Sequence, residues 1–198
     1  YGPNRWPADL PELQAVMHEY WAACDRAAAP IMAAYADGLG VDPDVFARWH
    51  TAPLTNMTLL HYPAQPPASD AMGIHPHKDT NVITLLHPGD VPGLEARSRD
   101  GEWINPDAPS DALVVNVGEM LELWSGGAYV ATPHRVVNRS GQERYSFPFF
   151  VVPNHDVVVE PLLPRQASYT ARPMPVGALS AEVWRTNWPE AVPEDTGF

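Results

Sequence analysis

The feature that most constrains the fold is a series of short β-rich runs that begins at residue 56. Segments rich in Val, Ile, Leu, Thr and Phe are separated there by turns that contain Pro, Gly, Asp and Asn. This pattern predicts strands at residues 56–61, 81–86, 93–96, 112–117, 130–138, 143–152 and 156–160. Because no helical pattern separates these runs, apart from a single helical turn expected at 119–124, we expect an antiparallel sandwich or barrel. The 23 prolines also disfavour a helical bundle.

The first forty residues are predicted to form a helix that precedes the β-region. Asp9 and Glu12 have the spacing of a capping box, and Pro11 would lie in the first turn. Pro30 is expected to kink or divide the helix, which should end near Gly40. One face is expected to be buried, and it comprises Leu13, Val16, Met17, Tyr20, Cys24, Ala27, Ile31 and Tyr35.

Length, charge and cysteine content limit the classes of function. A chain of 198 residues is long enough for one sizeable core, so we expect a single domain. The formal net charge of −12 disfavours nucleic acid and anionic membranes as partners, because both are negatively charged. The single cysteine, Cys24, excludes an intrachain disulfide and a thiolate zinc cluster. A reducing, cytoplasmic location and a small-molecule substrate are the simplest expectations.

Histidines are concentrated in one stretch, which is the first indication of a metal site. Five of the eight histidines lie between residues 50 and 87. Within this stretch His77 and Asp79 are two residues apart, so a strand would project both side chains from one face. His134 provides a third candidate ligand, on the strand predicted at 130–138. Two imidazoles and one carboxylate, with other metal positions left open, are the facial arrangement of non-haem Fe(II) oxygenases.

A candidate carboxylate receptor follows ten residues after His134. Arg144 and Ser146 share one face of a predicted strand. The planar guanidinium of arginine matches a carboxylate through two parallel hydrogen bonds. A receptor of this kind, one strand away from a facial metal site, predicts a dicarboxylate cosubstrate such as 2-oxoglutarate. Phe150 has the same strand parity as Arg144 and Ser146, so it is a candidate contact for the substrate.

Several segments between residues 56 and 153 carry motifs that occur together in one enzyme family. They are 77–79 (HKD), 93–96 (GLEA), 101–104 (GEWI), 114–124 (VVNVGEMLELW), 132–138 (TPHRVVN) and 144–150 (RYSFPFF). In this order they resemble the isopenicillin N synthase-like branch of the Fe(II)/2-oxoglutarate-dependent dioxygenases. Residues 2–7 (GPNRWP) and the helix after them are also similar to what precedes the core in that family.

The resemblance implies both a fold and a chemistry. The fold is mainly β with flanking α-helices, and its core is a double-stranded β-helix (jelly roll). The reaction uses dioxygen to hydroxylate, desaturate or cyclise a small organic substrate, and it releases succinate and CO2. The implied site residues are His77, Asp79 and His134 for Fe(II), and Arg144, Ser146 and Tyr62 for the cosubstrate 2-oxoglutarate.

Two positions depart from the family pattern, and two alternative functions stay open. Lys78, the only lysine of the chain, stands where threonine is commoner, and Leu60 stands where many plant members carry asparagine. An oxidase of the same branch that works without 2-oxoglutarate would keep the Arg-x-Ser pair. The other alternative is a catalytically silent relative or a cupin-type binding protein. In a cupin, His75 and His77 would both be metal ligands.

The chain is predicted to comprise three segments of one structural domain. Residues 1–55 form a helical support segment, residues 56–160 form the jelly-roll core, and residues 161–198 form a C-terminal extension that packs on the core and contains a weak helix at 181–188. Family members are usually longer, so we expect an N-terminal portion of the family to be absent from a chain that starts at Tyr1. Because all candidate metal and cosubstrate residues lie in the core, the absence of that portion should affect stability and substrate choice more than reaction type.

Overall fold

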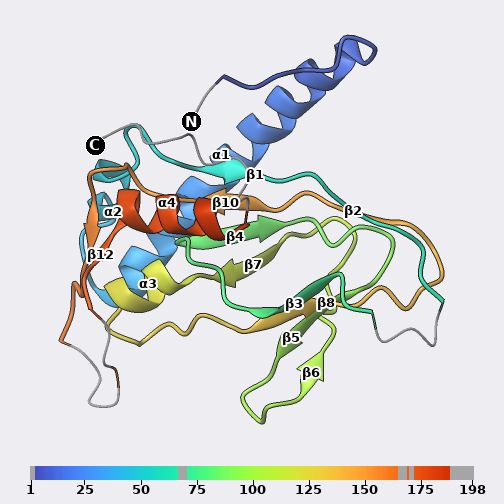
Figure 1. Ribbon diagram of the computed structural model, residues 1–198. Helices are drawn as coiled ribbons and strands as arrows, with labels where there is room; N and C mark the ends of the chain where they lie inside the picture. The colour runs from blue at the N-terminus through green and yellow to red at the C-terminus, as the bar shows by residue number, and fades with distance from the viewer. Residues whose placement is uncertain (1–2, 67–70, 165–168, 170–171, 188–198) are drawn as a thin grey trace.

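The computed structural model describes residues 3–66, 71–164, 169 and 172–187. Two four-stranded antiparallel sheets form its core (Figure 1). The major sheet has the strand order β1 (Asn56–Met57), β10 (Phe149–Val151), β4 (Ile83–Leu86) and β7 (Val114–Val117). The minor sheet has the order β3 (Ile74–His77), β8 (His134–Val136), β5 (Leu94–Arg97) and β6 (Trp103–Ile104). The chain crosses repeatedly between the two sheets, so the predicted double-stranded β-helix is confirmed.

Two short ladders complete the strands. One pairs β2 (Leu60–Tyr62) with β9 (Arg144–Ser146), and the other pairs β11 (Val158–Val159) with β12 (Met174–Pro175). The strands expected at 56–61 and 143–152 are therefore each divided in two. The division falls at Pro148, which has no N–H for the ladder, although its carbonyl oxygen accepts a hydrogen bond from the N–H of Thr58 at 3.3 Å.

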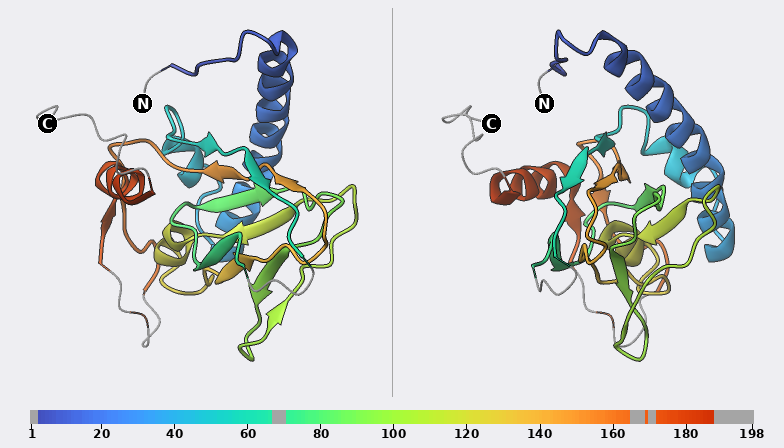
Figure 2. Two further views of the ribbon diagram at one scale, coloured as in Figure 1. Left: turned by 45° about the vertical axis from the view of Figure 1, so that its right-hand side comes forward. Right: turned by 90° about the vertical axis from the view of Figure 1, so that its right-hand side faces the viewer.

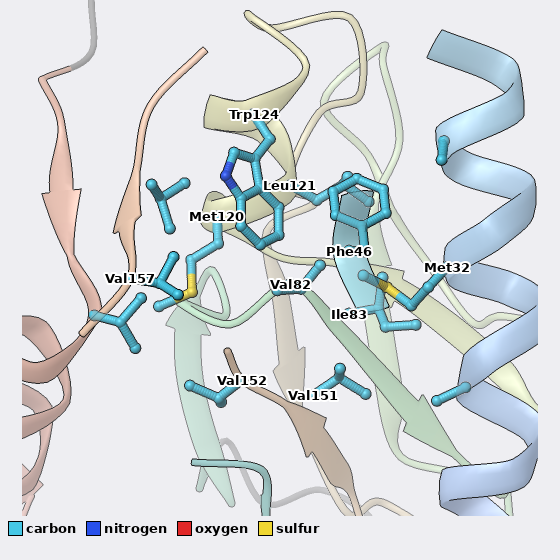
Figure 3. Close-up of a cluster of buried hydrophobic side chains, with 14 of the residues drawn as sticks. Met32, Phe46, Val82, Ile83, Met120, Leu121, Trp124, Val151, Val152 and Val157 are labelled. Atoms are coloured by element: carbon cyan, nitrogen blue, oxygen red, sulfur yellow. The ribbon is translucent and has the colours of Figure 1, made fainter. Parts of the chain in front are cut away.

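In the described part of the chain four helices accompany the sheets, namely α1 (Pro11–Leu39), α2 (Val45–Arg48), α3 (Glu119–Trp124) and α4 (Val176–Asn187). Residues of α1, α2 and α3 form one buried cluster with the outward face of the major sheet. Figure 3 shows Phe46 of α2 and Trp124 of α3 in this cluster, next to Val82 and Ile83. The helical turn expected at 119–124 is confirmed. The weak helix expected at 181–188 begins earlier, at Val176, and its expected last residue lies outside the described residues.

Strand alternation gives the major sheet two different faces. In β4, Ile83 and Leu85 are fully buried in the helix-covered cluster, whereas Thr84 and Leu86 point into a cavity between the sheets. The same alternation in β10 directs Phe150 into the cavity. The outward face of this sheet therefore provides the core, and its inward face is free to carry functional side chains.

Helix α1 differs from expectation at its start and in its middle. The N-cap is Leu10, without a side-chain hydrogen bond, so the capping box of Asp9 and Glu12 is wrong. The helix is continuous through Pro30, and the division predicted there is wrong as well. Pro30 is exposed, and side chains buried on both sides of it, at Ala28 and Met32, hold the two halves to the core.

The C-terminal end of α1 is confirmed, but of the eight residues expected on its buried face only Cys24 is buried. Gly40 adopts the left-handed conformation, with φ of 68°, that favours glycine at a helix end. The buried residues of α1 are Cys24, Ala28, Met32 and Ala36. Val16 is 56% exposed, because the N-terminal half of α1 extends beyond the sheets (Figure 2). Among the described residues, no helix combines the length and apolar character needed to cross a bilayer.

Candidate metal centre and cosubstrate pocket

Strand register brings two of the predicted ligands face to face. His77 at the end of β3 is the direct cross-strand partner of His134 at the start of β8, and their ring centroids are 4.2 Å apart. Asp79 follows β3 by two residues. Its Oδ1 lies 3.7 Å from Nε2 of His77 and 3.5 Å from Nε2 of His134. The ligand atoms of the three residues all lie within 4.8 Å of one another, and these side chains could hold a metal ion.

Backbone carbonyls fix which nitrogen of each imidazole faces the centre. Nδ1 of His77 lies 2.8 Å from the carbonyl oxygen of His75, and Nδ1 of His134 lies 3.1 Å from that of Thr132. A carbonyl oxygen can only accept, so each Nδ1 carries the hydrogen and donates it. In the neutral rings each Nε2 therefore presents a lone pair towards Asp79. This is the tautomer that a metal-binding histidine requires.

Asp79 is held by its other carboxylate oxygen. Oδ2 accepts hydrogen bonds from the hydroxyl of Thr84 at 2.5 Å and from Nδ2 of Asn116 at 2.9 Å. The Thr84 hydroxyl in turn accepts from Nδ2 of Asn81 at 2.8 Å, so its hydrogen is available only for Asp79. Asp79 is 8% exposed, and Oδ1 is the oxygen left for a ligand bond. Three electron-rich atoms thus converge without a hydrogen between them, an arrangement that fits a divalent cation such as Fe(II).

The candidate carboxylate receptor lies in the same cavity, on the neighbouring ladder. Arg144 and Tyr62 are cross-strand partners in β9 and β2, and the guanidinium carbon lies 5.0 Å from the centre of the Tyr62 ring. Arg144 is only 2% exposed. Its Nε donates to the carbonyl oxygen of Val91 at 3.2 Å, but its buried Nη1 has no hydrogen-bond partner among the described residues. An unpaired buried cation is costly, so this group fits an anionic ligand.

Burial shifts the pKa values of this pair in the directions expected for a dry pocket. Removal from water lowers the pKa of the Arg144 guanidinium, and the neighbouring Tyr62 opposes this change. Burial likewise raises the pKa of the Tyr62 phenol, with Arg144 opposing it. The phenol therefore keeps its hydrogen at neutral pH and can act as a donor. Ser146, which is buried on the same face of β9 as Arg144, adds a hydroxyl.

The cavity that joins the two groups is otherwise largely apolar. Its volume is about 280 Å³, and His77, Asp79, His134 and Arg144 all line it. Most of the remaining lining comes from apolar residues, which are Leu60, Ile74, Leu86, Leu94, Ala96, Pro106, Val114, Val115, Val136, Pro148 and Phe150. The predicted inward orientation of Phe150 is confirmed. Such a lining excludes water from the space between the metal-binding atoms and the guanidinium.

The side chain of His75, the alternative candidate ligand, does not take part in this centre. His75 is exposed, and it contributes its backbone oxygen rather than its side chain. The group of possible metal ligands among the described residues does not include it, which disfavours the cupin arrangement.

Sequence reasoning missed Thr84 and Asn116 as functional residues. The available signal was a single polar residue within each of two apolar strands, ITLL and VVNV.

Comparisons with known proteins identify the family. Residues 54–153 match the model of the 2OG-Fe(II) oxygenase superfamily. A 2-oxoglutarate-Fe(II) type oxidoreductase of Emericella nidulans is 37% identical in an alignment of 164 residues that covers 79% of this chain and 47% of that protein. A homoarginine-6-hydroxylase of Glycine max is 34% identical in an alignment of 169 residues that covers 81% of this chain and 51% of that protein. The chain thus spans about half the length of the curated relatives it matches.

Solved structures show the same fold. The crystal structure of a full-length Neurospora crassa protein in complex with alpha-KG and thymine superposes with a TM-score of 0.84 at 27% identity. The match covers 94% of this chain and 61% of that one. The jelly-roll core and the metal and cosubstrate chemistry predicted from the sequence are therefore those of a known family of oxidoreductases.

Proposed function

Because this chain belongs to the 2OG-Fe(II) oxygenase superfamily, whose members use Fe(II), 2-oxoglutarate and dioxygen, we propose that it oxidises a small organic substrate with these cofactors. In the balanced reaction, a substrate C–H bond, 2-oxoglutarate and O2 give a C–OH group, succinate and CO2. Desaturation or ring closure are other outcomes of the same chemistry. The observation that carries the proposal is one apolar cavity that contains three converging metal-binding atoms and a buried guanidinium with an unpaired Nη1.

Each candidate residue has a distinct role in this proposal. Fe(II) is held by His77, Asp79 and His134, through the two Nε2 atoms and Oδ1. Bound iron supplies the redox chemistry that couples decarboxylation of 2-oxoglutarate to oxidation of the substrate. The distal carboxylate of 2-oxoglutarate satisfies Nη1 of Arg144, and the hydroxyls of Ser146 and Tyr62 assist it. Phe150 is the proposed contact for the organic substrate.

The protein contributes orientation and exclusion of water. The hydrogen bonds from His77 and His134 to backbone carbonyls keep both Nε2 lone pairs available. The bonds from Thr84 and Asn116 hold the Asp79 carboxylate in a fixed orientation. The apolar side chains around the cavity exclude water that would compete for the open metal positions. A small-molecule substrate fits this cavity, whereas a cytoplasmic location and the division of the chain at residues 55 and 160 stay predictions.

The test is an anaerobic titration with Fe(II) and 2-oxoglutarate, followed by measurement of succinate in air. We expect a weak visible charge-transfer band when both are bound, and succinate formation that candidate substrates accelerate. His77→Ala should abolish both signals. His75→Ala is the matched control, because this exposed histidine lies two residues away and is expected to change neither signal.

The outcomes separate the alternatives. Loss of the metal in His75→Ala as well as in His77→Ala would favour the cupin arrangement. Substrate oxidation without succinate would favour the oxidase that needs no 2-oxoglutarate. A wild-type chain that binds neither Fe(II) nor 2-oxoglutarate would overturn the proposed function.

A further inference from the structure

The only lysine of the chain lies between two of the candidate metal ligands, and it is not free. Lys78 follows His77 and precedes Asp79. Its Nζ lies 3.1 Å from Oε2 of Glu122, a residue of α3. The side chain of Lys78 is 34% exposed and that of Glu122 only 13%, so the pair is partly shielded from water. The β3–β4 connection, which carries Asp79, is thus tied to helix α3.

The same carboxylate oxygen also holds the second ligand-bearing segment. Oε2 of Glu122 accepts a hydrogen bond from the backbone N–H of Ala131 at 3.1 Å. Ala131 is fully buried and lies three residues before His134. One oxygen atom therefore connects the segment that carries His77 and Asp79 with the segment that carries His134.

Helix α3 is attached to the first of these segments by its backbone as well. The N–H of Glu119 donates to the carbonyl oxygen of Asp79 at 2.8 Å, and the N–H of Met120 donates to that of Asn81 at 3.1 Å. These are N–H groups of the first helical turn, which have no partner within the helix. The position of α3 therefore determines the position of the chain immediately after His77. Through Glu122, the same helix also holds the backbone at Ala131.

We propose that Glu122 is a positioning residue that sets the separation between the two metal-binding segments, with Lys78 as its partner. The inference rests on the proposed function, because it concerns the same metal centre. A partly buried carboxylate that accepts from both an ammonium group and a backbone N–H fixes two points of the chain at once. Its removal takes away the ion-pair partner of Lys78 and the acceptor of the buried Ala131 N–H, and the two segments are then free to separate.

The experiment measures the affinity of the whole chain for Co(II), used as a spectroscopic substitute for Fe(II), in Glu122→Ala and Lys78→Met. Groups that orient ligands typically contribute about 10–100-fold to metal affinity, and we expect a loss in this range for Glu122→Ala. Lys78→Met should cause a smaller loss, because the Ala131 contact is kept. Lys78→Arg should retain the wild-type affinity and the wild-type Co(II) absorption spectrum, since it preserves the charge.

A matched control separates positioning from stability. Asp42→Asn breaks the ion pair between Asp42 and Arg48, which is 2.9 Å long and remote from the cavity, and it should leave Co(II) affinity unchanged. Thermal unfolding of the metal-free variants is measured in parallel.

Unchanged Co(II) affinity and spectrum in both Glu122→Ala and Lys78→Met, with or without a lower melting temperature, would overturn the inference. If Glu122→Ala does not fold, Lys78→Met alone decides. Failure of the wild-type chain to bind metal would overturn the proposed function instead.

Discussion

Thr84 and Asn116 lie directly opposite each other on β4 and β7, and both donate to the same carboxylate oxygen of Asp79. The two histidines of the site form a second cross-strand pair, His77 with His134, in the other sheet. Asp79 thus joins the two sheets: its Oδ1 faces the histidines of the minor sheet, and its Oδ2 is bound to the major sheet. The geometry of the candidate metal centre depends on how the two sheets pack against each other.

Replacement of Thr84 by valine should weaken metal binding without removing a ligand. Valine has nearly the shape of threonine but no hydroxyl, so Oδ2 of Asp79 loses one of its two donors and the carboxylate can rotate. Loss of a hydrogen bond that orients a ligand typically costs about 10–100-fold in metal affinity. The measurement is an anaerobic Fe(II) titration of wild type and variant.

Thr55→Val is a suitable control for this substitution. The Thr55 hydroxyl also makes hydrogen bonds, but its partner is the backbone of Val152, the residue that follows β10. The control should lower the free energy of unfolding by about 1 kcal/mol and leave iron affinity unchanged. Equal iron affinity in Thr84→Val and wild type would contradict the role given to Thr84.

Replacement of Arg144 by lysine should weaken the binding of 2-oxoglutarate without changing the binding of the metal. Lysine keeps the positive charge but lacks the planar fork that makes two parallel hydrogen bonds to a carboxylate. We expect 2-oxoglutarate to bind at least about tenfold more weakly, because one charge-assisted hydrogen bond contributes about 1.5–3 kcal/mol. Co(II) affinity in the absence of 2-oxoglutarate should not change, because Arg144 contacts none of the three candidate ligands. If the variant binds 2-oxoglutarate as tightly as wild type, a group other than Arg144 binds the distal carboxylate.

The candidate ligands themselves could be identified from local pattern, although their convergence depends on how the two sheets pack. His77 and Asp79 are two residues apart, and His134 lies in a strand with clear β-character. The inward face of Phe150 followed from strand alternation alone. Strand β3, in contrast, was missed, because three of the four residues in IHPH are polar or ring-constrained, the proline among them, and the segment does not alternate as a half-buried strand does.

The residues that hold the ligands were not predictable for a different reason. Thr84 and Asn116 act together only because β4 and β7 pair in one register, and nothing within either strand specifies that register. Glu122 likewise is one of two acidic residues in a short helix until the fold brings Lys78 and Ala131 to it. The continuity of α1 through Pro30 has the same origin, because tertiary packing overrides the local penalty of proline.

The stability of the protein should decrease above about pH 10, and Tyr20 should contribute to the decrease. Burial, reinforced by the nearby Cys24, raises the pKa of Tyr20 to about 12. An unfolded tyrosine ionises near pH 10, so between these values the unfolded state binds fewer protons and the free energy of unfolding falls as pH rises. Urea unfolding at several pH values should show a shallower decrease in Tyr20→Phe. In a titration followed by tyrosine absorbance, the variant should lack a step near pH 12 that the wild type shows. If the variant instead lacks a step near pH 10, the raised pKa given to Tyr20 is contradicted.

Substitution of Gly118 by alanine should disturb both stability and the metal centre. A Cβ atom at this position would overlap the backbone oxygen of Asn81, in the segment just after Asp79. Forced displacement of packed groups typically costs about 1–3 kcal/mol, measurable by urea unfolding, and the shift of this segment should also reduce Co(II) affinity. Gly40→Ala is the control. Its cost of about 1–2 kcal/mol comes from the left-handed backbone, with no atom within 4 Å of the added carbon, so Co(II) affinity should be unchanged. An equal effect of both variants on Co(II) affinity would show that lost stability, rather than displacement of the segment after Asp79, weakens the metal site.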